Sequence, residues 1–274
     1  MTEITDAGQS RGSEVGKVLK SPLFWGLAVV ASAAAGIAGG LYYDPAAGAG
    51  AAAAAFIFVM VCGFAYAKAM AVQSFHESYA ESRGLTTSKG QLGKLTPLLA
   101  QGADQRTDAM MSGPLDQGFA GSLALFTVTD SHLDNQRNET RKDNPFTLVH
   151  IELPETAARL PELIVRPRSG TGVLEIEGDL RQARESIRLE SQALDDRFEI
   201  LVARDQDPGF VRQVFSPSFI VWLSEKPPPG FGFELAAGNL VSLVPGYRAD
   251  KQGFDEMIDA GSTVAARLRE EASE

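Results

Sequence analysis

Two long apolar stretches lie near the start of the chain. Residues 22–43 (PLFWGLAVVASAAAGIAGGLYY) carry no charge, and residues 46–67 (AAGAGAAAAAFIFVMVCGFAYA) follow directly after Asp44 and Pro45. A helix rises 1.5 Å per residue, so about 20 residues cover the roughly 30 Å of a bilayer core. The pattern predicts a transmembrane helical hairpin over residues 22–67, with the lipid bilayer as its partner.

Lysine and arginine flank the outer ends of both stretches. Lys17 and Lys20 precede the first and Lys68 and Arg83 follow the second, whereas the turn between them carries only Asp44. The positive-inside rule therefore predicts a multi-pass plasma membrane protein with both termini in the cytoplasm. A secretory signal peptide is the alternative for the first stretch, but its apolar run is longer than the usual core of about 7–15 residues and a second span follows it.

Small residues recur at helical spacing in both spans. Gly36 and Gly40 lie four apart in the first, and Gly48 and Ala52 in the second. Such pairs let helix backbones approach closely in a membrane. We expect them to pack within the hairpin, with a homo-oligomer through Gly36 and Gly40 as the alternative.

Shorter periodic patterns follow the second span. Residues 68–101 read as a juxtamembrane helix and linker, in which a helix over 68–83 ends at Gly84 and a short helix covers 92–101. Residues 1–21 form a cytoplasmic tail. Residues 102–274 then form a soluble domain.

The soluble domain alternates apolar and polar residues over many short runs. Strands are expected at 106–112, 122–129, 146–153, 163–165, 173–176, 187–190, 198–202, 231–235 and 240–244. The polar stretch 130–144 is expected to be an exposed loop. Short helices are expected at 208–215 and 217–224, and a helical turn near 155–160.

The chain closes with an amphipathic pattern over residues 250–271. One apolar stripe at helical spacing contains Phe254, Met257, Ile258, Gly261, Val264, Ala265 and Leu268. Many antiparallel strands followed by such a helix indicate an α+β fold. A partial barrel plugged by the helix, as in pleckstrin-homology-like domains, is one form this fold can take.

The net charge of the chain indicates which classes of partner it can bind. The formal net charge is −10, and the tail and the two spans are each balanced, so the excess of acidic residues lies in the soluble domain. Phosphate backbones repel such a domain, so nucleic acid is not expected as a partner. The basic residues Arg137, Arg141 and Lys142 are interleaved with acidic ones and read as a solvated surface.

The sequence contains few residues in patterns typical of catalytic or metal-binding sites. The three histidines, His76, His132 and His150, share no metal-ligand spacing, and the single cysteine, Cys62, lies inside the second span. No glycine-rich phosphate loop or nucleophile elbow is present. The sequence therefore predicts no catalytic, cofactor-binding or metal-binding residues, no cofactor, and a protein partner in place of a substrate.

Acidic pairs leave an enzymatic alternative open. Asp130 with Asp134, Asp195 with Asp196, and Asp205 with Asp207 fit solvated surfaces, yet paired carboxylates can also perform acid–base chemistry. Convergence of Asp205, Asp207 and His150 on one deep pocket would favour an enzyme. A large apolar cavity inside the sheet would favour a lipid or small-ligand carrier.

One stretch carries a family resemblance. Residues 189–200 (LESQALDDRFEI) are followed by the acidic turn 205–207 and by residues 215–223 (FSPSFIVWL). This order resembles a family of two-span bacterial membrane proteins with a domain of unknown function, whose pattern is "ES", "RF", a strand, an acidic turn, a short helix and "SP" or "TP". Because the family has no established activity, the resemblance transfers no catalytic residue. The sparse site chemistry, together with the sheet and anchor patterns, favours a membrane-anchored cytoplasmic interaction or scaffold module.

Overall fold

The computed structural model describes residues 21–88, 90–93, 95–133, 139–168 and 178–273. The chain forms two compact units, Met1–Tyr79 and Ala80–Glu274. The strand expected at 173–176 lies outside the described residues. The fold is α+β, as the sequence predicts: two long apolar helices, then a nine-stranded antiparallel sheet and a C-terminal helix.

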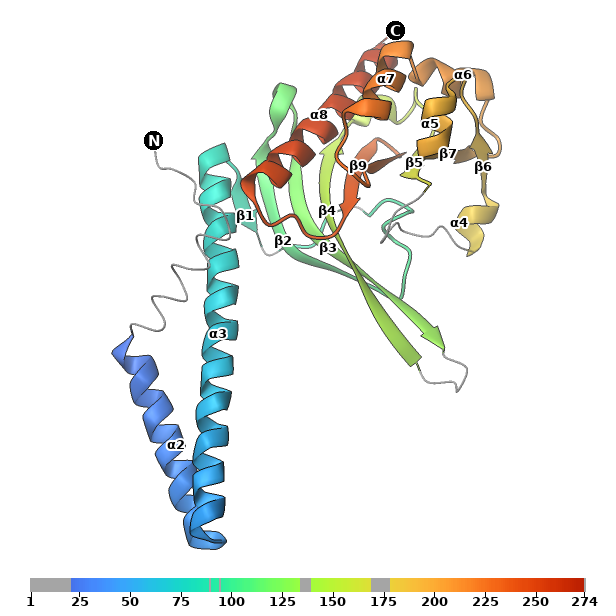
Figure 1. The fold of residues 1–274 in the computed structure, drawn as a ribbon. Helices are drawn as coiled ribbons and strands as arrows, with labels where there is room; N and C mark the ends of the chain where they lie inside the picture. Colours follow the sequence, from blue (N-terminus) through green and yellow to red (C-terminus); the bar gives the residue numbers. More distant parts are fainter. Residues whose placement is uncertain (1–20, 89, 94, 134–138, 169–177, 274) are drawn as a thin grey trace. The chain divides into compact units, whose positions relative to one another are not determined.

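The first unit is a helical hairpin. Helix α2 (Pro22–Tyr42) begins with proline, which suits the first helical position because its missing N–H has no partner there, and α3 (Pro45–Arg83) begins in the same way after the turn (Figure 1). Asp44 caps α3, accepting a hydrogen bond from the Ala47 N–H at 2.7 Å. Both helices are long and apolar enough to cross a membrane by length and composition.

Small residues set the approach of α2 to α3. A Cβ placed on Gly48 would lie 2.7 Å from the Gly36 carbonyl oxygen and 2.8 Å from the Gly40 nitrogen, closer than real Cβ atoms come. A Cβ on Gly36 would lie 3.2 Å from the Ala52 Cβ. The expected close packing within the hairpin is therefore present. A contact between chains through Gly36 and Gly40 stays a prediction.

The second unit is built on one sheet with the strand order β1-β2-β3-β4-β9-β8-β5-β7-β6. Its strands are β1 (Thr86–Ser88), β2 (Asp104–Pro114), β3 (Ala120–Leu133), β4 (Glu139–Glu152), β5 (Leu163–Pro167), β6 (Arg184–Ile187), β7 (Phe198–Ala203), β8 (Gly232–Ala236) and β9 (Asn239–Pro245). Over the described residues β1 and β6 are the two edges and do not pair with each other, so the sheet is open. The pleckstrin-homology-like form stays a prediction.

Short helices connect the strands. They are η1 (Asp116–Gly118), η2 (Pro154–Thr156), α4 (Gly178–Gln182), α5 (Gln192–Arg197), α6 (Pro208–Val214) and α7 (Pro217–Glu225). Helix α8 (Lys251–Ser273) closes the chain and lies across one face of the sheet (Figure 1). Its seven predicted stripe residues are all buried.

The opposite face of the sheet has a different cover. Leu92, Leu98 and Leu99 from the segment before β2 are buried in one cluster with sheet residues that include Leu148 and Val241. The helix expected over 92–101 is wrong, since residues 97–100 form a turn. Pro97 has no N–H to donate and disfavours helical geometry in the residue before it, so this apolar segment crosses the face in an irregular path.

The loop expected over residues 130–144 is also wrong. Strands β3 and β4 continue as a two-stranded ribbon, in which Asp130 pairs with Lys142 and Ser131 with Arg141 (Figure 1). Such a ribbon needs only backbone hydrogen bonds and polar cross-strand pairs, so it has no apolar face for a periodicity test to detect.

A polar cluster stands near the start of that ribbon. Thr127 donates to an oxygen of Asp108 at 2.8 Å, Tyr247 donates to the same oxygen, and Arg106 binds the other at 2.7 Å. Burial and the neighbouring Asp108 raise the pKa of Tyr247 to about 12. The register between β2 and β3 shifts next to Asp108, which identifies a bulge there.

Candidate binding groove

A hollow of about 420 Å³ lies between α7 and α8, a volume within the range of small-molecule and side-chain pockets. It is lined by Gln117, Ser218, Phe219, Trp222, Thr263, Ala266, Arg267 and Glu270. The sequence pattern did not identify this groove.

Helical spacing explains the α8 wall. Ala266 and Arg267 each lie three or four residues from both Thr263 and Glu270, so the four residues share one stripe beside the buried stripe of the same helix. The helical spacing of these α8 residues could be seen in the sequence. Nothing in the sequence alone told which element faces it.

The α7 wall rests on a well-formed helix start. Ser216 caps α7, accepting a hydrogen bond from the Phe219 N–H at 3.4 Å, and Pro217 occupies the first helical position. This local sequence, Ser-Pro-Ser-Phe, lies inside the stretch that carries the family resemblance. It fixes where Phe219 and Trp222 enter the groove.

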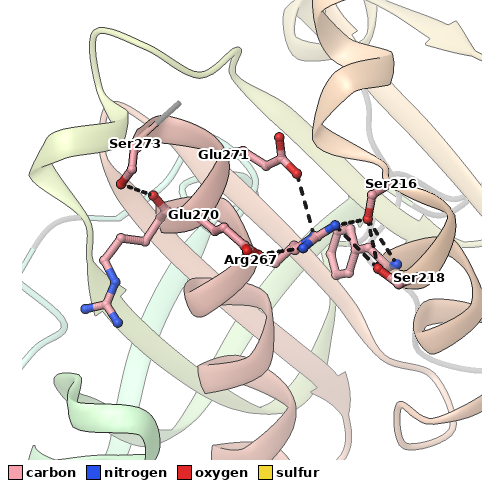
Figure 2. Close-up of polar contacts among 8 residues, drawn as sticks. Ser216, Ser218, Arg267, Glu270, Glu271 and Ser273 are labelled. Carbon is pink, nitrogen blue, oxygen red and sulfur yellow. Dashed lines mark hydrogen bonds and ion pairs between the residues drawn. The ribbon is translucent and has the colours of Figure 1, made fainter.

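Arg267 joins the two walls (Figure 2). Its guanidinium donates to the Ser216 hydroxyl and, at 3.4 Å, to the Ser218 hydroxyl, both at the start of α7. On its own helix it pairs with Glu270 at 2.6 Å and with Glu271 at 3.6 Å. Arg267 thus holds α8 against the cap of α7, and its bonds to Glu270 and Glu271 balance its charge.

Aromatic stacking stiffens the groove from below. The Phe219 ring stacks on Phe215 at 5.8 Å and on Trp222 at 5.9 Å between centroids, and Trp222 meets Phe231 edge-on at 6.2 Å. Phe219 is buried and Trp222 is partly exposed. Such packing holds the indole in place before anything binds, which lowers the entropy cost of recognition.

The groove lining combines aromatic, polar and charged side chains. Its lining offers one indole face, three small polar groups and a single carboxylate, Glu270, which already pairs with Arg267. No group of three or more potential metal ligands occurs among the described residues. The lining contains no pair of carboxylates or nucleophile with a base for acid–base or covalent catalysis.

The residues of the enzymatic alternative do not come together. His150 is buried on β4, where its Nε2 lies 3.3 Å from the Asn239 side-chain oxygen, and burial lowers its pKa. Asp207 caps α6 through the Gly209 N–H, and Asp205 lies exposed in the turn after β7. Strands β4 and β7 are four positions apart in the sheet, which is about 19 Å at the usual strand spacing.

The other acidic residues serve the fold. Asp130 accepts a hydrogen bond from Asn144 at 2.7 Å across the ribbon, and Asp195 accepts one from the Leu189 N–H at 3.2 Å. Asp196 lines a separate hollow beside two arginines, Arg168 and Arg188. Asp134 and Arg137 lie outside the described residues.

The sequence did not single out a buried polar group at the centre of the sheet. Glu234 on β8 is fully buried, and both its carboxylate oxygens accept the Leu98 N–H, at 3.0 and 3.1 Å. Burial raises its pKa to about 7, although Leu98 and Arg184 favour the ionised form. A lone glutamate inside the apolar run Phe231 to Ala236 was the available signal.

A lipid or small-ligand carrier would need a large apolar cavity within the sheet. A hollow beside Phe233 and Leu243 holds only about 10 Å³, less than the volume of one small ligand. The neighbouring face is filled by the leucine, phenylalanine and valine side chains of the core cluster. These residues give no support to a carrier.

Comparison with known proteins assigns no family. No protein-family model matches the sequence, and no curated protein matches it. Among solved structures, the described fold is similar to the crystal structure of the mycobacterial trehalose monomycolate transport factor A, TtfA, with 9% sequence identity, a TM-score of 0.46, and coverage of 71% of this chain and 90% of that chain. A similarity at this level carries no argument about function.

Proposed function

We propose that this chain is a membrane-anchored interaction module, which binds a protein segment in the groove between α7 and α8. The observation that carries the proposal is the stacked, partly exposed Trp222 in a hollow of about 420 Å³ that is also lined by Gln117, Ser218 and Thr263. Tryptophan in a rigid pocket is the side chain most often found at the energetic centre of protein interfaces.

The two apolar helices support the anchor. Their lengths, 21 and 39 residues, exceed the 20 or so that a bilayer needs, and the longer helix has residues left to continue beyond it. The distribution of lysine and arginine supports cytoplasmic termini and a binding domain at the inner face of the plasma membrane. A fluorescent reporter fused after the C-terminus, bright only when it folds in the cytoplasm, tests this orientation.

Charge supports a basic partner. Residues 73–274 carry the whole net charge of −10, and Glu270 at the groove is exposed. An acidic surface steers cationic ligands and raises their association rate. The expected ligand is a peptide segment with one large apolar side chain for Trp222 and a lysine or arginine near Glu270.

Selection from a random peptide library on the full chain in lipid nanodiscs tests this function. We expect enriched peptides that combine an apolar residue with a basic residue. Trp222→Ala should weaken their binding at least tenfold, since it removes the aromatic wall. Val221→Ala is the matched control, because Val221 lies next in the same helix, is 54% exposed and does not line the groove.

Two results would refute this assignment. One is the failure of any peptide class to enrich over empty nanodiscs. The other is enrichment of peptides that bind the wild type and the Trp222→Ala chain equally well, because their site would then lie elsewhere.

A further inference from the structure

The segment 90–101, which we name the strap, covers the sheet face opposite α8 without forming a helix or a strand in its described residues. Three leucines of the strap, Leu92, Leu98 and Leu99, are buried against the sheet, and Leu99 is fully buried. These leucines pack on apolar side chains of the sheet, and the described residues of the strap belong to no strand of the sheet. Side chains of the sheet must therefore satisfy its buried N–H groups.

Two side chains do this. The Thr107 hydroxyl accepts the Leu92 N–H at 3.3 Å near one end of the strap. At the other end the Glu234 carboxylate accepts the Leu98 N–H through both oxygens, at 3.0 and 3.1 Å. The second contact is the deeper one, because Glu234 and Leu98 are both buried whereas the Leu92–Thr107 bond is partly exposed.

Apolar neighbours surround Glu234 in the sheet. It is in register with Val241 on β9 and with Ile164 on β5, and all three belong to the strap-covered face. A carboxylate placed there loses its hydration, which favours the neutral form. The same burial raises the pKa of Glu234 to about 7 from an ordinary value near 4.5.

The charged groups that face Glu234 are few. Arg184 from β6 is 6% exposed and pairs with Glu162 at 3.5 Å, while its Nε and Nη1 atoms have no hydrogen-bond partner. The strap has one charged residue, Lys94, which lies outside the described residues. Further along the same face, Arg166 of β5 and Arg181 of α4 are both bound to Glu199 of β7.

We propose that Glu234 is a proton-controlled latch, which holds the strap closed when its carboxyl is neutral and releases the strap when the carboxyl ionises. Opening lets water reach the carboxylate and exposes the apolar face beneath Leu98 and Leu99. The strap is thereby a regulated cover over a second apolar surface of the domain, separate from the α7–α8 groove.

The sign of the effect follows from linkage. The pKa of Glu234 is higher in the closed state than in the open one, so the closed state is favoured most below pH 4.5 and loses stability as pH rises towards 7. The opening equilibrium should rise about tenfold per pH unit over that range and level off above it.

Hydrogen exchange measured by mass spectrometry on the full chain in nanodiscs tests the latch. Rates between pH 5 and 8.5 are corrected for the intrinsic chemistry and compared between strap amides and amides of β3 and β4. We expect strap exchange to rise by about fortyfold from pH 5 to 7 while the sheet changes little. Glu234→Gln keeps an acceptor for Leu98 but does not titrate, so its strap exchange should be independent of pH.

Equal pH slopes in wild type and Glu234→Gln, or a flat wild-type profile, would overturn the proposal. If the variant does not fold, carboxyl-carbon NMR of the wild type provides the second measurement. A Glu234 titration midpoint near 4.5, together with strap protection that does not follow it, would overturn the proposal as well.

Discussion

The two faces of the sheet are sealed in contrasting ways. Helix α8 covers one face with a continuous apolar stripe and satisfies its own backbone hydrogen bonds internally. Gly261 lets it approach β4 closely, since a Cβ there would lie 2.9 Å from a methyl carbon of Val149.

The strap covers the other face with only three buried leucines and an irregular backbone. Because the strap is not paired with a strand, two of its backbone N–H groups donate instead to the side chains of Thr107 and Glu234. The same face contains the ion pairs of Glu199 with Arg166 and Arg181. The comparison teaches that a helix can seal a sheet by packing alone, whereas an irregular cover brings ionisable groups into the core.

Removing a large side chain from the helix-covered face should have the largest effect. Phe254 is fully buried on α8, so Phe254→Ala should lower the free energy of unfolding by about 4 kcal/mol. Asp259→Ala, at an exposed position of the same helix, should change it by less than about 0.5 kcal/mol. Urea denaturation of the detergent-solubilised chain measures both.

The corresponding change beneath the strap should cost less. Leu99→Ala removes a fully buried side chain, but an irregular segment can relax into the space, so we expect a loss of about 2–3 kcal/mol. Gln91→Ala, exposed in the same segment, is the control. A greater loss for Leu99→Ala than for Phe254→Ala would reverse the ranking of the two faces.

Glu199 should show the opposite pH dependence to Glu234. Burial alone would raise the pKa of Glu199, but the hydrogen bonds and charges of Arg166 and Arg181 hold it below its ordinary value. Its contribution is therefore present above pH 4.5 and disappears as pH falls below that value. Glu199→Gln should cost about 2 kcal/mol at pH 7, since it leaves the arginines unpaired.

The check on Glu199 is the pH profile of stability. The difference between wild type and Glu199→Gln should shrink as pH falls from 5 to 3 in denaturation experiments. A difference that stays constant over this range would show that shape, and not charge, is what Glu199 contributes to the face.

The smallest expected effect concerns the helices at the edge of the α8 face. Ser216 both caps α7 and accepts from Arg267, so Ser216→Ala should destabilise the domain by about 1 kcal/mol. Ser218→Ala keeps the cap and loses two exposed contacts, one with Arg267 at 3.4 Å and one with the Ser216 hydroxyl at 3.1 Å, so it should lower stability by less than about 0.5 kcal/mol. Thermal melting of the two variants side by side separates the cap from the arginine contact.

The sequence predicted the elements whose pattern is local. Both long helices and the buried stripe of α8 follow from apolar runs and helical spacing, and the strands from 106 to 129 and from 231 to 244 follow from alternation. The strand expected at 187–190 lies instead at Arg184–Ile187, where Arg184 pairs in register with Ala203 of β7. Partner strands, more than local pattern, set such boundaries.

The two wrong elements share one cause. Residues 92–101 are apolar but cross a sheet face as a strap, and residues 130–144 are polar but pair as a ribbon. The strap depends on a partner distant in sequence, since Glu234 is 136 positions from Leu98, and the ribbon depends on pairing between two neighbouring strands. Local propensity is weak against tertiary contacts of this kind.

The sequence by itself determined the two long apolar helices, the acidic charge and the α+β class, because each depends on composition or on periodicity within one segment. Only the tertiary structure decided that Trp222 and Arg267 share a groove, that His150 and Asp205 stand strands apart, and that Glu234 is buried under Leu98. These facts depend on strand order and on which element covers which face. Side chains far apart in the chain acquire a common environment only when the sheet assembles.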